Sequence, residues 1–178
     1  NEELKYMSRV DGLTGLYNRR YWQERFDNTF KLARRRDKPV TAMMLDIDHF
    51  KQVNDTYGHQ AGDKVIQALA EIIRETVRET DLAGRYGGEE FAVILTDADC
   101  GKASLVAERI REAAQQATVN HEDTEIRFTV SLGLAPFDAS YRSAMAWLEQ
   151  ADIALYDAKT RGRNQACVKT ADMVKTGT

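Results

Sequence analysis

The sequence predicts an α+β fold in which helices flank a sheet with an antiparallel centre, and three observations lead to this expectation. The apolar run at residues 40–45 is typical of a central strand that is buried on both faces. Gly87-Gly88 joins two apolar arms at residues 82–86 and 90–95, as in a β-hairpin. Segments with helical periodicity lie between the first strand and this hairpin and again after the hairpin. A central antiparallel hairpin with helices packed on the strands indicates a ferredoxin-like, palm-type sheet.

Length and composition indicate one globular domain. The 178 residues are 43% hydrophobic and 30% charged, which is enough to build a substantial core. The net charge of −3 argues against nucleic acid as a partner. Cys100 and Cys167 have no metal-ligand spacing, so a reducing, cytoplasmic compartment is expected. Because no apolar run is long enough to span a bilayer, this domain is expected to make no direct membrane contact.

The two ends of the chain are expected to lie outside the domain proper. Residues 1–10 carry Leu4 and Met7 at helical spacing, which indicates either the end of an upstream signalling helix or a frayed terminus. The chain begins with Asn1 rather than Met, and we expect a sensory region upstream through which the full-length protein could be anchored to a membrane. The domain is expected over residues 11–169, followed by a disordered tail over 170–178.

The remaining elements follow from periodicity and capping signals. Asn18 is a suitable N-cap for an amphipathic helix that ends near three arginines, where cations suit the helix dipole. Gly58 is a suitable end for a short helix that follows the first strand. Alternation with period two predicts a strand at residues 126–134. Further helices are expected at residues 63–78, 100–117 and 144–159, and an edge strand at residues 165–169.

Acidic side chains stand where two of the predicted strands meet turns. Asp46 and Asp48 end the first strand and point to one face if the chain stays extended. Glu89 and Glu90 follow the two glycines, which both tolerate positive φ in a tight turn. Burying unpaired carboxylates is costly, so a metal site is expected. The alternatives are a solvated hairpin turn and two strand-end caps exposed to water.

The predicted sheet would bring Asp46, Glu89 and Glu90 together. Carboxylates of this kind hold Mg²⁺ that also grips substrate phosphates, and two such ions favour in-line attack on phosphorus. Lys159 and Arg163, four residues apart, would supply cations for a polyphosphate. These residues predict phosphoryl or nucleotidyl transfer.

Several motifs, in order, resemble those of the GGDEF family, the diguanylate cyclases that condense two GTP into cyclic di-GMP. Residues 87–91, Gly-Gly-Glu-Glu-Phe, resemble the signature, with Glu89 in place of its aspartate, a variant that the active family includes. The other matching segments are residues 11–20, 46–51, 54–59, 62–63 and 151–164. The resemblance covers nearly the whole chain and implies a nucleotidyl-cyclase-like fold.

The resemblance also implies a role for each matching residue. Asp46 and Glu89, with the Ile47 carbonyl, would ligate two Mg²⁺ or Mn²⁺ ions, and Glu90 would deprotonate the ribose 3′-hydroxyl or hold a metal. Gly87 and Gly88 would leave room for the sugar and α-phosphate. Those that would bind GTP are His49, Phe50 and Lys51 with Lys159 and Arg163 at the β- and γ-phosphates, and Asn54, His59 and Asp63 at the guanine.

A further motif implies regulation by the product. Arg78 and Asp81 resemble the family's RxxD inhibitory site and would bind cyclic di-GMP, with Arg109 as an additional contact, although a helix-end charge pair explains the same pattern. A product with two 3′–5′ bonds implies a two-fold homodimer. Two alternatives stay open: a catalytically silent cyclic di-GMP receptor, which would predict damage in the acidic cluster, and another palm-type nucleotidyl transferase, which would not need Asn54 and Asp63.

Overall fold

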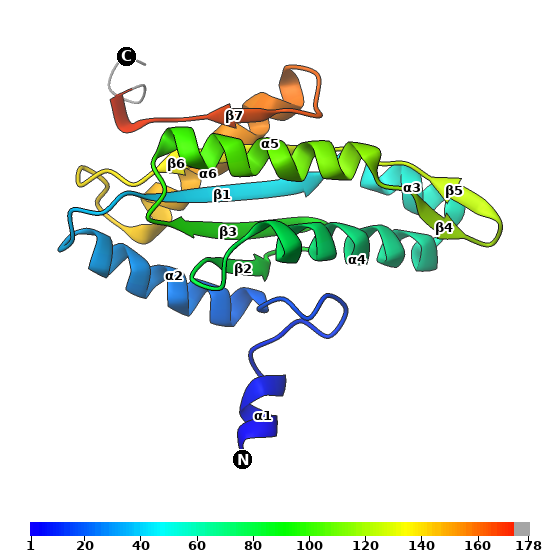
Figure 1. Cartoon of the computed structure of the whole chain (residues 1–178), viewed down its shortest axis with the longest axis horizontal. Coiled ribbons are helices and arrows are strands. Elements are labelled where there is room, and N and C mark those ends of the chain that lie inside the picture. Colours follow the sequence, from blue (N-terminus) through cyan, green and yellow to red (C-terminus); the bar gives the residue numbers. More distant parts are fainter. Residues whose placement is uncertain (173–178) are drawn as a thin grey trace.

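The computed structural model describes residues 1–172 and contains a five-stranded sheet of order β2-β3-β1-β6-β7 (Figure 1). The strands are β1 (Val40–Ile47), β2 (Leu82–Arg85), β3 (Glu90–Thr96), β6 (Val130–Pro136) and β7 (Ala166–Val168), with β4 (Val119–His121) and β5 (Thr124–Ile126) in a separate hairpin. The helices are α1 (Glu2–Met7), α2 (Arg19–Ala33), α3 (Phe50–Tyr57), α4 (His59–Thr76), α5 (Cys100–Gln116) and α6 (Ala144–Thr160).

The centre of the sheet is antiparallel, as predicted. Strand β1 pairs antiparallel with both β3 and β6, and β7 adds to β6 in parallel. The chain order β1–helices–β2–β3–α5–β6 with the spatial order β2-β3-β1-β6 is the ferredoxin-like arrangement. The predicted α+β fold class is therefore confirmed, and β1 is buried along its whole length.

Helices cover both faces of the sheet because alternate residues of each central strand point to opposite sides. Met43 and Leu45 of β1 belong to the apolar cluster that contains the inner faces of α4 and α5. Ala42 and Met44 belong to the other cluster, in which α2 and α6 contribute Trp22, Phe26 and Trp147. Asp46 continues the second set, so its side chain points toward α6.

One local expectation is wrong, and one element was not expected. The alternation at residues 126–134 does not mark one continuous strand: β5 ends at Ile126, β6 begins at Val130, and β6 is buried on both faces. Helices on both sides of the sheet are the reason. The β4–β5 hairpin, which the sequence did not indicate, lies at the end of the sheet (Figure 1) and contacts α4, where Lys64 Nζ donates to the Asn120 carbonyl at 3.4 Å.

The terminal segments differ in how they contact the domain. Helix α1 has no buried residue and stands apart from the sheet (Figure 1). Ala171, at the start of the predicted tail, is buried among the residues of the α2–α6 cluster, whereas residues 173–178 of that tail lie outside the described residues. Within residues 1–172, no helix combines the length and apolar character that a membrane crossing needs.

Candidate active site

The carboxylates predicted to act together meet at one end of the β1–β3 pair. Asp46 of β1 lies opposite Glu90 of β3 in the strand register, and the Ile47 amide donates to the Glu89 carbonyl at 3.3 Å. From the face that α6 covers, Lys159 Nζ reaches Asp46 Oδ2 at 2.5 Å. The sheet and α6 together therefore place three carboxylates and one ammonium group at the same strand ends.

Burial governs the electrostatics of this cluster. Desolvation raises the pKa of Asp46 to about 6, against the Lys159 ammonium, which lowers it, while the negative charges of Glu89 and Glu90 raise it further. Desolvation also raises the pKa of Glu90, and the neighbouring Asp152 adds to the effect. Negative charge at this site is therefore in excess, which a bound cation would relieve.

The turn that carries Glu89 and Glu90 is built differently from the prediction. Among the described residues, positive φ among glycines occurs at Gly15, Gly58 and Gly162, so neither Gly87 nor Gly88 uses the left-handed region. The turn is closed by the amides of Tyr86 and Gly87, which donate to the Glu90 carbonyl at 2.8 and 3.2 Å. A Cβ at Gly87 would lie 2.9 Å from Glu90 Oε2, so this glycine leaves room for the Glu90 carboxylate.

The donor set fits a divalent metal that binds together with substrate. No group of three or more histidine, cysteine or acidic side chains in residues 1–172 forms a ready-made cage. Magnesium, however, is commonly held by one or two carboxylates, with phosphates and water completing the octahedron. Asp46, Glu89 and the Ile47 carbonyl would supply hard oxygen ligands of this kind, and the excess negative charge matches a cation.

Asp48 does not join the acidic cluster. Its oxygens accept hydrogen bonds from Thr129 Oγ1 at 2.7 Å, Ser131 Oγ at 2.6 Å and the Asn164 amide at 3.0 Å. Neither a metal site nor a water-exposed cap describes this buried carboxylate. Asp48 therefore holds the segment that follows α6 against the end of β1. This contact fixes the position of Arg163, the residue before Asn164.

The residues predicted to bind phosphates surround the start of α3. His49 precedes the helix with φ of 54°, a left-handed conformation that is costly for a residue with a side chain, and it provides no side-chain cap. The first amides of a helix have no partner within the helix and suit an anion. Lys51 is exposed on this helix, and Arg163 is exposed after α6. Lys159 contacts Asp46 at the end of β1.

The predicted guanine-reading residues lie on two helices in contact, α3 and α4. The side chain of Asn54 rests on Gly62, where an added Cβ would stand 1.9 Å from Asn54 Oδ1. That oxygen is buried and has no hydrogen-bond partner among residues 1–172. Asp63 is the next residue along α4, and His59 begins the same helix. The structure therefore places Asn54 against the residue that precedes Asp63 on α4.

Arg78 and Asp81 are separate from this site. Asp81 is buried: its carboxylate accepts from the Arg78 amide at 2.9 Å and from the Thr96 amide at 3.0 Å. The Arg78 guanidinium lies 3.6 Å from Asp81, donates to the Thr96 carbonyl and is 59% exposed. Asp81 thus positions Arg78, whose guanidinium can meet an anion from solvent. Arg109 is exposed on α5.

Two charged residues near Glu90 were not predicted to belong to the site. Asp152 of α6 raises the pKa of Glu90, and Arg19 lowers it while lying 4.3 Å from the Tyr86 ring centre. Desolvation raises the pKa of Asp152 itself. Asp152 and Lys159 are seven residues apart, which is about two helical turns. This spacing was the sequence signal that Asp152 lies on the same face of α6 as Lys159.

Comparisons with known proteins agree with this geometry. A family model described as diguanylate cyclase, GGDEF domain, matches residues 8–165. The probable diguanylate cyclase DgcC of Escherichia coli K12 is 40% identical over 162 residues, which cover 91% of this chain and 43% of that protein. The response regulator PleD of Caulobacter vibrioides is 41% identical over 164 residues, covering 91% of this chain and 36% of its own.

Solved structures give the same result. The coiled coil and GGDEF domain of DgcB from Caulobacter crescentus, in complex with c-di-GMP, aligns with a TM-score of 0.88 at 34% identity over 96% of this chain and 89% of that chain. The active GGEEF domain of a diguanylate cyclase from Vibrio cholerae aligns with a TM-score of 0.79 at 30% identity, over 85% of this chain and 96% of its own.

The chain belongs to the GGDEF domain family, and its fold is the nucleotidyl-cyclase-like fold of that family. It spans less than half the length of DgcC and PleD.

Proposed function

We propose that this domain is a diguanylate cyclase, which converts two GTP into one cyclic di-GMP and two pyrophosphates. The observation that carries the proposal is the register of Asp46 opposite Glu90 at the strand ends, with Lys159 in contact with Asp46. The start of α3 and the α3–α4 contact would supply the phosphate and guanine contacts. Relatives named as diguanylate cyclases support the assignment.

The reaction needs groups for charge, proton and position. The 3′-oxygen of one GTP bonds to the α-phosphorus of the other, while the bond from that phosphorus to the bridging oxygen breaks and pyrophosphate leaves. Two Mg²⁺ or Mn²⁺ ions, when bound, would neutralise phosphate charge and lower the pKa of the attacking hydroxyl. Asp46, Glu89 and the Ile47 carbonyl would hold them. Glu90 would accept the proton, and Lys159 and Arg163 would hold the leaving phosphates.

The proposed reaction requires two copies of the domain. One domain offers one nucleotide site, whereas the product contains two equivalent 3′–5′ bonds. Two domains related by a two-fold axis would aim each 3′-hydroxyl at the other α-phosphate. A sensory region before α1 would control how often two domains meet in this way. A cytoplasmic location follows from GTP as substrate.

The first experiment is incubation of the purified domain, freed of bound product, with GTP and Mg²⁺ at several protein concentrations. Chromatography should show cyclic di-GMP, and the rate should rise more steeply than linearly with protein, as a two-domain reaction demands. Tight binding of added cyclic di-GMP without any synthesis would instead make the domain a receptor. Product that forms linearly down to the lowest concentration would contradict a transient dimer.

Gly62→Ala is expected to damage GTP recognition without unfolding the domain. The new methyl group would displace the Asn54 amide, since that side chain is flexible and the helix tolerates alanine well. The KM for GTP should rise about tenfold, the range expected for loss of a hydrogen bond to a base edge. Steady-state kinetics and thermal unfolding would measure both effects. Asn54→Ala should raise KM similarly, and a normal KM in Gly62→Ala would contradict this role of Asn54.

Arg78→Ala is expected to relieve product inhibition while sparing synthesis. The guanidinium is largely exposed, so its loss would remove the proposed anion contact and little of the core. The concentration of cyclic di-GMP that halves the rate should rise at least about tenfold, because a charge-assisted phosphate contact is strong. Initial rates with and without added product would measure this. Arg109→Ala provides a comparison, and unchanged inhibition in Arg78→Ala would rule out this site.

A further inference from the structure

The loop between α1 and α2 is joined by its main chain to the strand that leads into the catalytic turn. A bridge between Val10 and Tyr17 closes the neck of this loop, and Tyr17 then pairs with the outer edge of β2. The Tyr17 amide donates to the Ala83 carbonyl at 3.2 Å, and the Arg85 amide donates to the Tyr17 carbonyl at 2.9 Å. Arg85 is therefore held by the loop one residue before the turn begins.

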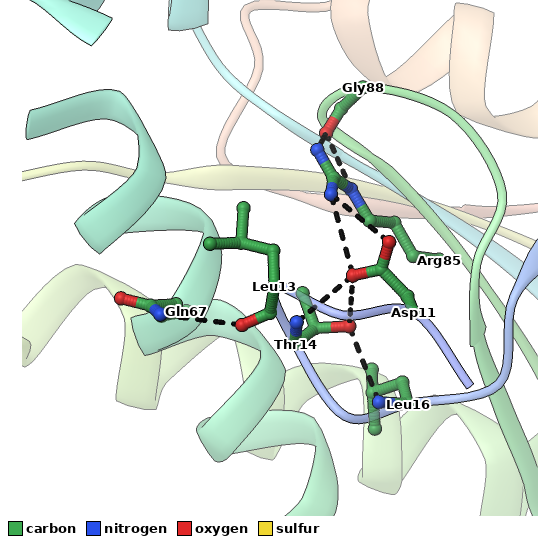
Figure 2. A network of polar contacts seen from close by, with 7 residues as sticks. All are labelled: Asp11, Leu13, Thr14, Leu16, Gln67, Arg85 and Gly88. Carbon is green, nitrogen blue, oxygen red and sulfur yellow. Dashed lines mark hydrogen bonds and ion pairs between the residues drawn. The ribbon is translucent and has the colours of Figure 1, made fainter. Parts of the chain in front are cut away.

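The Arg85 side chain links this loop to the turn itself. Its Nε and Nη2 donate to the Gly88 carbonyl at 3.1 and 2.9 Å (Figure 2). Its Nη1 lies 3.3 and 3.4 Å from the two carboxylate oxygens of Asp11. About four fifths of each charged side chain is buried, with 20% of Arg85 and 21% of Asp11 exposed. The guanidinium thus fills the space between the loop and the turn.

Asp11 is itself fixed in orientation (Figure 2). The Thr14 amide and hydroxyl donate to Asp11 Oδ2 at 2.9 and 2.8 Å. Contacts from α4 hold the same loop: Gln67 donates to the Leu13 carbonyl at 3.3 Å, and Arg74 donates to the Thr14 carbonyl at 2.5 Å. A carboxylate held from several sides is a rigid anchor for Arg85.

The turn needs an outside restraint. Two consecutive glycines have the greatest backbone freedom, and a Cβ at Gly88 would meet nothing within 4 Å, so packing does not restrain this residue. The backbone hydrogen bonds within the turn all end on the Glu90 carbonyl. The Gly88 carbonyl instead accepts two hydrogen bonds, both from the Arg85 side chain. The next two residues are Glu89 and Glu90.

We propose that Arg85 and Asp11 are positioning residues, which hold the Gly88 carbonyl and thereby fix where Glu89 and Glu90 point during the reaction. This inference rests on the cyclase activity proposed above. Displacing reacting groups by about 1 Å is enough to slow a reaction about a hundredfold. The proposed guanine and phosphate contacts come from α3, α4 and α6. Loss of the Arg85 contact should therefore lower kcat and leave KM for GTP nearly unchanged.

Kinetics of the Arg85→Ala and Asp11→Ala variants and of the double variant test the proposal. We expect kcat to fall about 10- to 100-fold, with KM for GTP within about threefold of wild type. The double variant should be no slower than the slower single variant, because both substitutions remove one linkage. Lys38→Ala is the control, since it removes an exposed ion pair to Asp97 at the opposite end of the β1–β3 pair. Normal kcat in folded Arg85→Ala, or additive losses in the double variant, would overturn the proposal.

Milder variants and a measurement independent of activity complete the test. Arg85→Lys keeps the positive charge but lacks the planar guanidinium that contacts Asp11 and Gly88 at the same time. Compared with Arg85→Ala, it should therefore recover thermal stability but not kcat. Hydrogen exchange of the Tyr86 and Gly87 amides should accelerate at least about tenfold in this variant and in Asp11→Asn, while amides of β1 stay protected. Unchanged exchange would overturn the proposal whatever the rates. Wild-type protein that makes no cyclic di-GMP would refute the proposed function, while exchange would still decide the role of Arg85.

Discussion

Replacing Glu90 by glutamine is expected to abolish synthesis of cyclic di-GMP while the domain stays folded and binds GTP. The rate should fall at least about a thousandfold, within the range expected when a general base is removed. Glutamine matches glutamate in shape, and the β3 pairing depends on the backbone of residue 90, which forms part of the register with Asp46. The amide can neither accept the proton nor add negative charge for a metal.

The same substitution should leave the melting temperature unchanged or raise it. Burial raises the pKa of Glu90, so the folded domain binds a proton there more readily than the unfolded chain. The resulting stabilisation is present at pH values below the ordinary glutamate pKa and is lost as pH rises through the raised pKa. At neutral pH the ionised side chain therefore opposes folding beside Asp46 and Asp152, and a neutral amide removes that opposition.

Chromatographic assays and thermal unfolding at neutral pH measure these two effects together. Glu125→Gln is a suitable control because Glu125 is exposed on β5, outside the carboxylate cluster, and its rate should match wild type. Turnover retained in Glu90→Gln would exclude Glu90 as base and as metal ligand. A lost rate with a collapsed melting temperature would instead assign Glu90 a structural role.

The sequence was sufficient for the arrangement of the main elements because their signals are local. The apolar run that became β1, the cap at Asn18 and the glycine at position 58 each act within a few residues. The prediction of one strand over residues 126–134 was wrong because a period-two pattern carries no information about helices that cover both faces of β6. The β4–β5 hairpin was missed because three-residue strands carry little periodicity.

The site shows the same division between local and distant contacts. Asp46 and Glu90 were expected together because an antiparallel centre brings a strand end next to the hairpin turn. The partners of Asp48 are Thr129 just before β6, Ser131 in β6 and Asn164 after α6, so its structural role depends on residues 81 to 116 positions away. The contact from Asp11 to Arg85 joins residues 74 positions apart and likewise has no local signal.

Gly133→Ala is expected to cause the largest loss of stability among the substitutions considered. Gly133 lies in the middle of β6, where α6 crosses so closely that an added Cβ would stand 2.1 Å from the Leu155 amide nitrogen and 2.2 Å from the Ala151 carbonyl oxygen. Both contacts are with backbone inside a helix, which cannot rotate away as a side chain does. Relief requires α6 to move from the sheet, and α6 carries Trp147 of the core and Lys159 of the site.

Chemical denaturation should show a loss of about 3–5 kcal/mol for Gly133→Ala, the range of severe overpacking with backbone displacement. Gly101→Ala is the matched control: it lies in the first turn of α5, where a Cβ would meet only Asp99 Oδ1 at 3.5 Å. Because alanine favours helix over glycine, that variant should gain up to about 1 kcal/mol. If the same Gly→Ala change lowers the free energy of unfolding at position 133 and raises it at position 101, the loss at position 133 comes from the close approach of α6 and not from replacing a glycine. A Gly133→Ala variant as stable as wild type would mean that α6 can shift on the sheet, and the Lys159–Asp46 contact should then weaken with it.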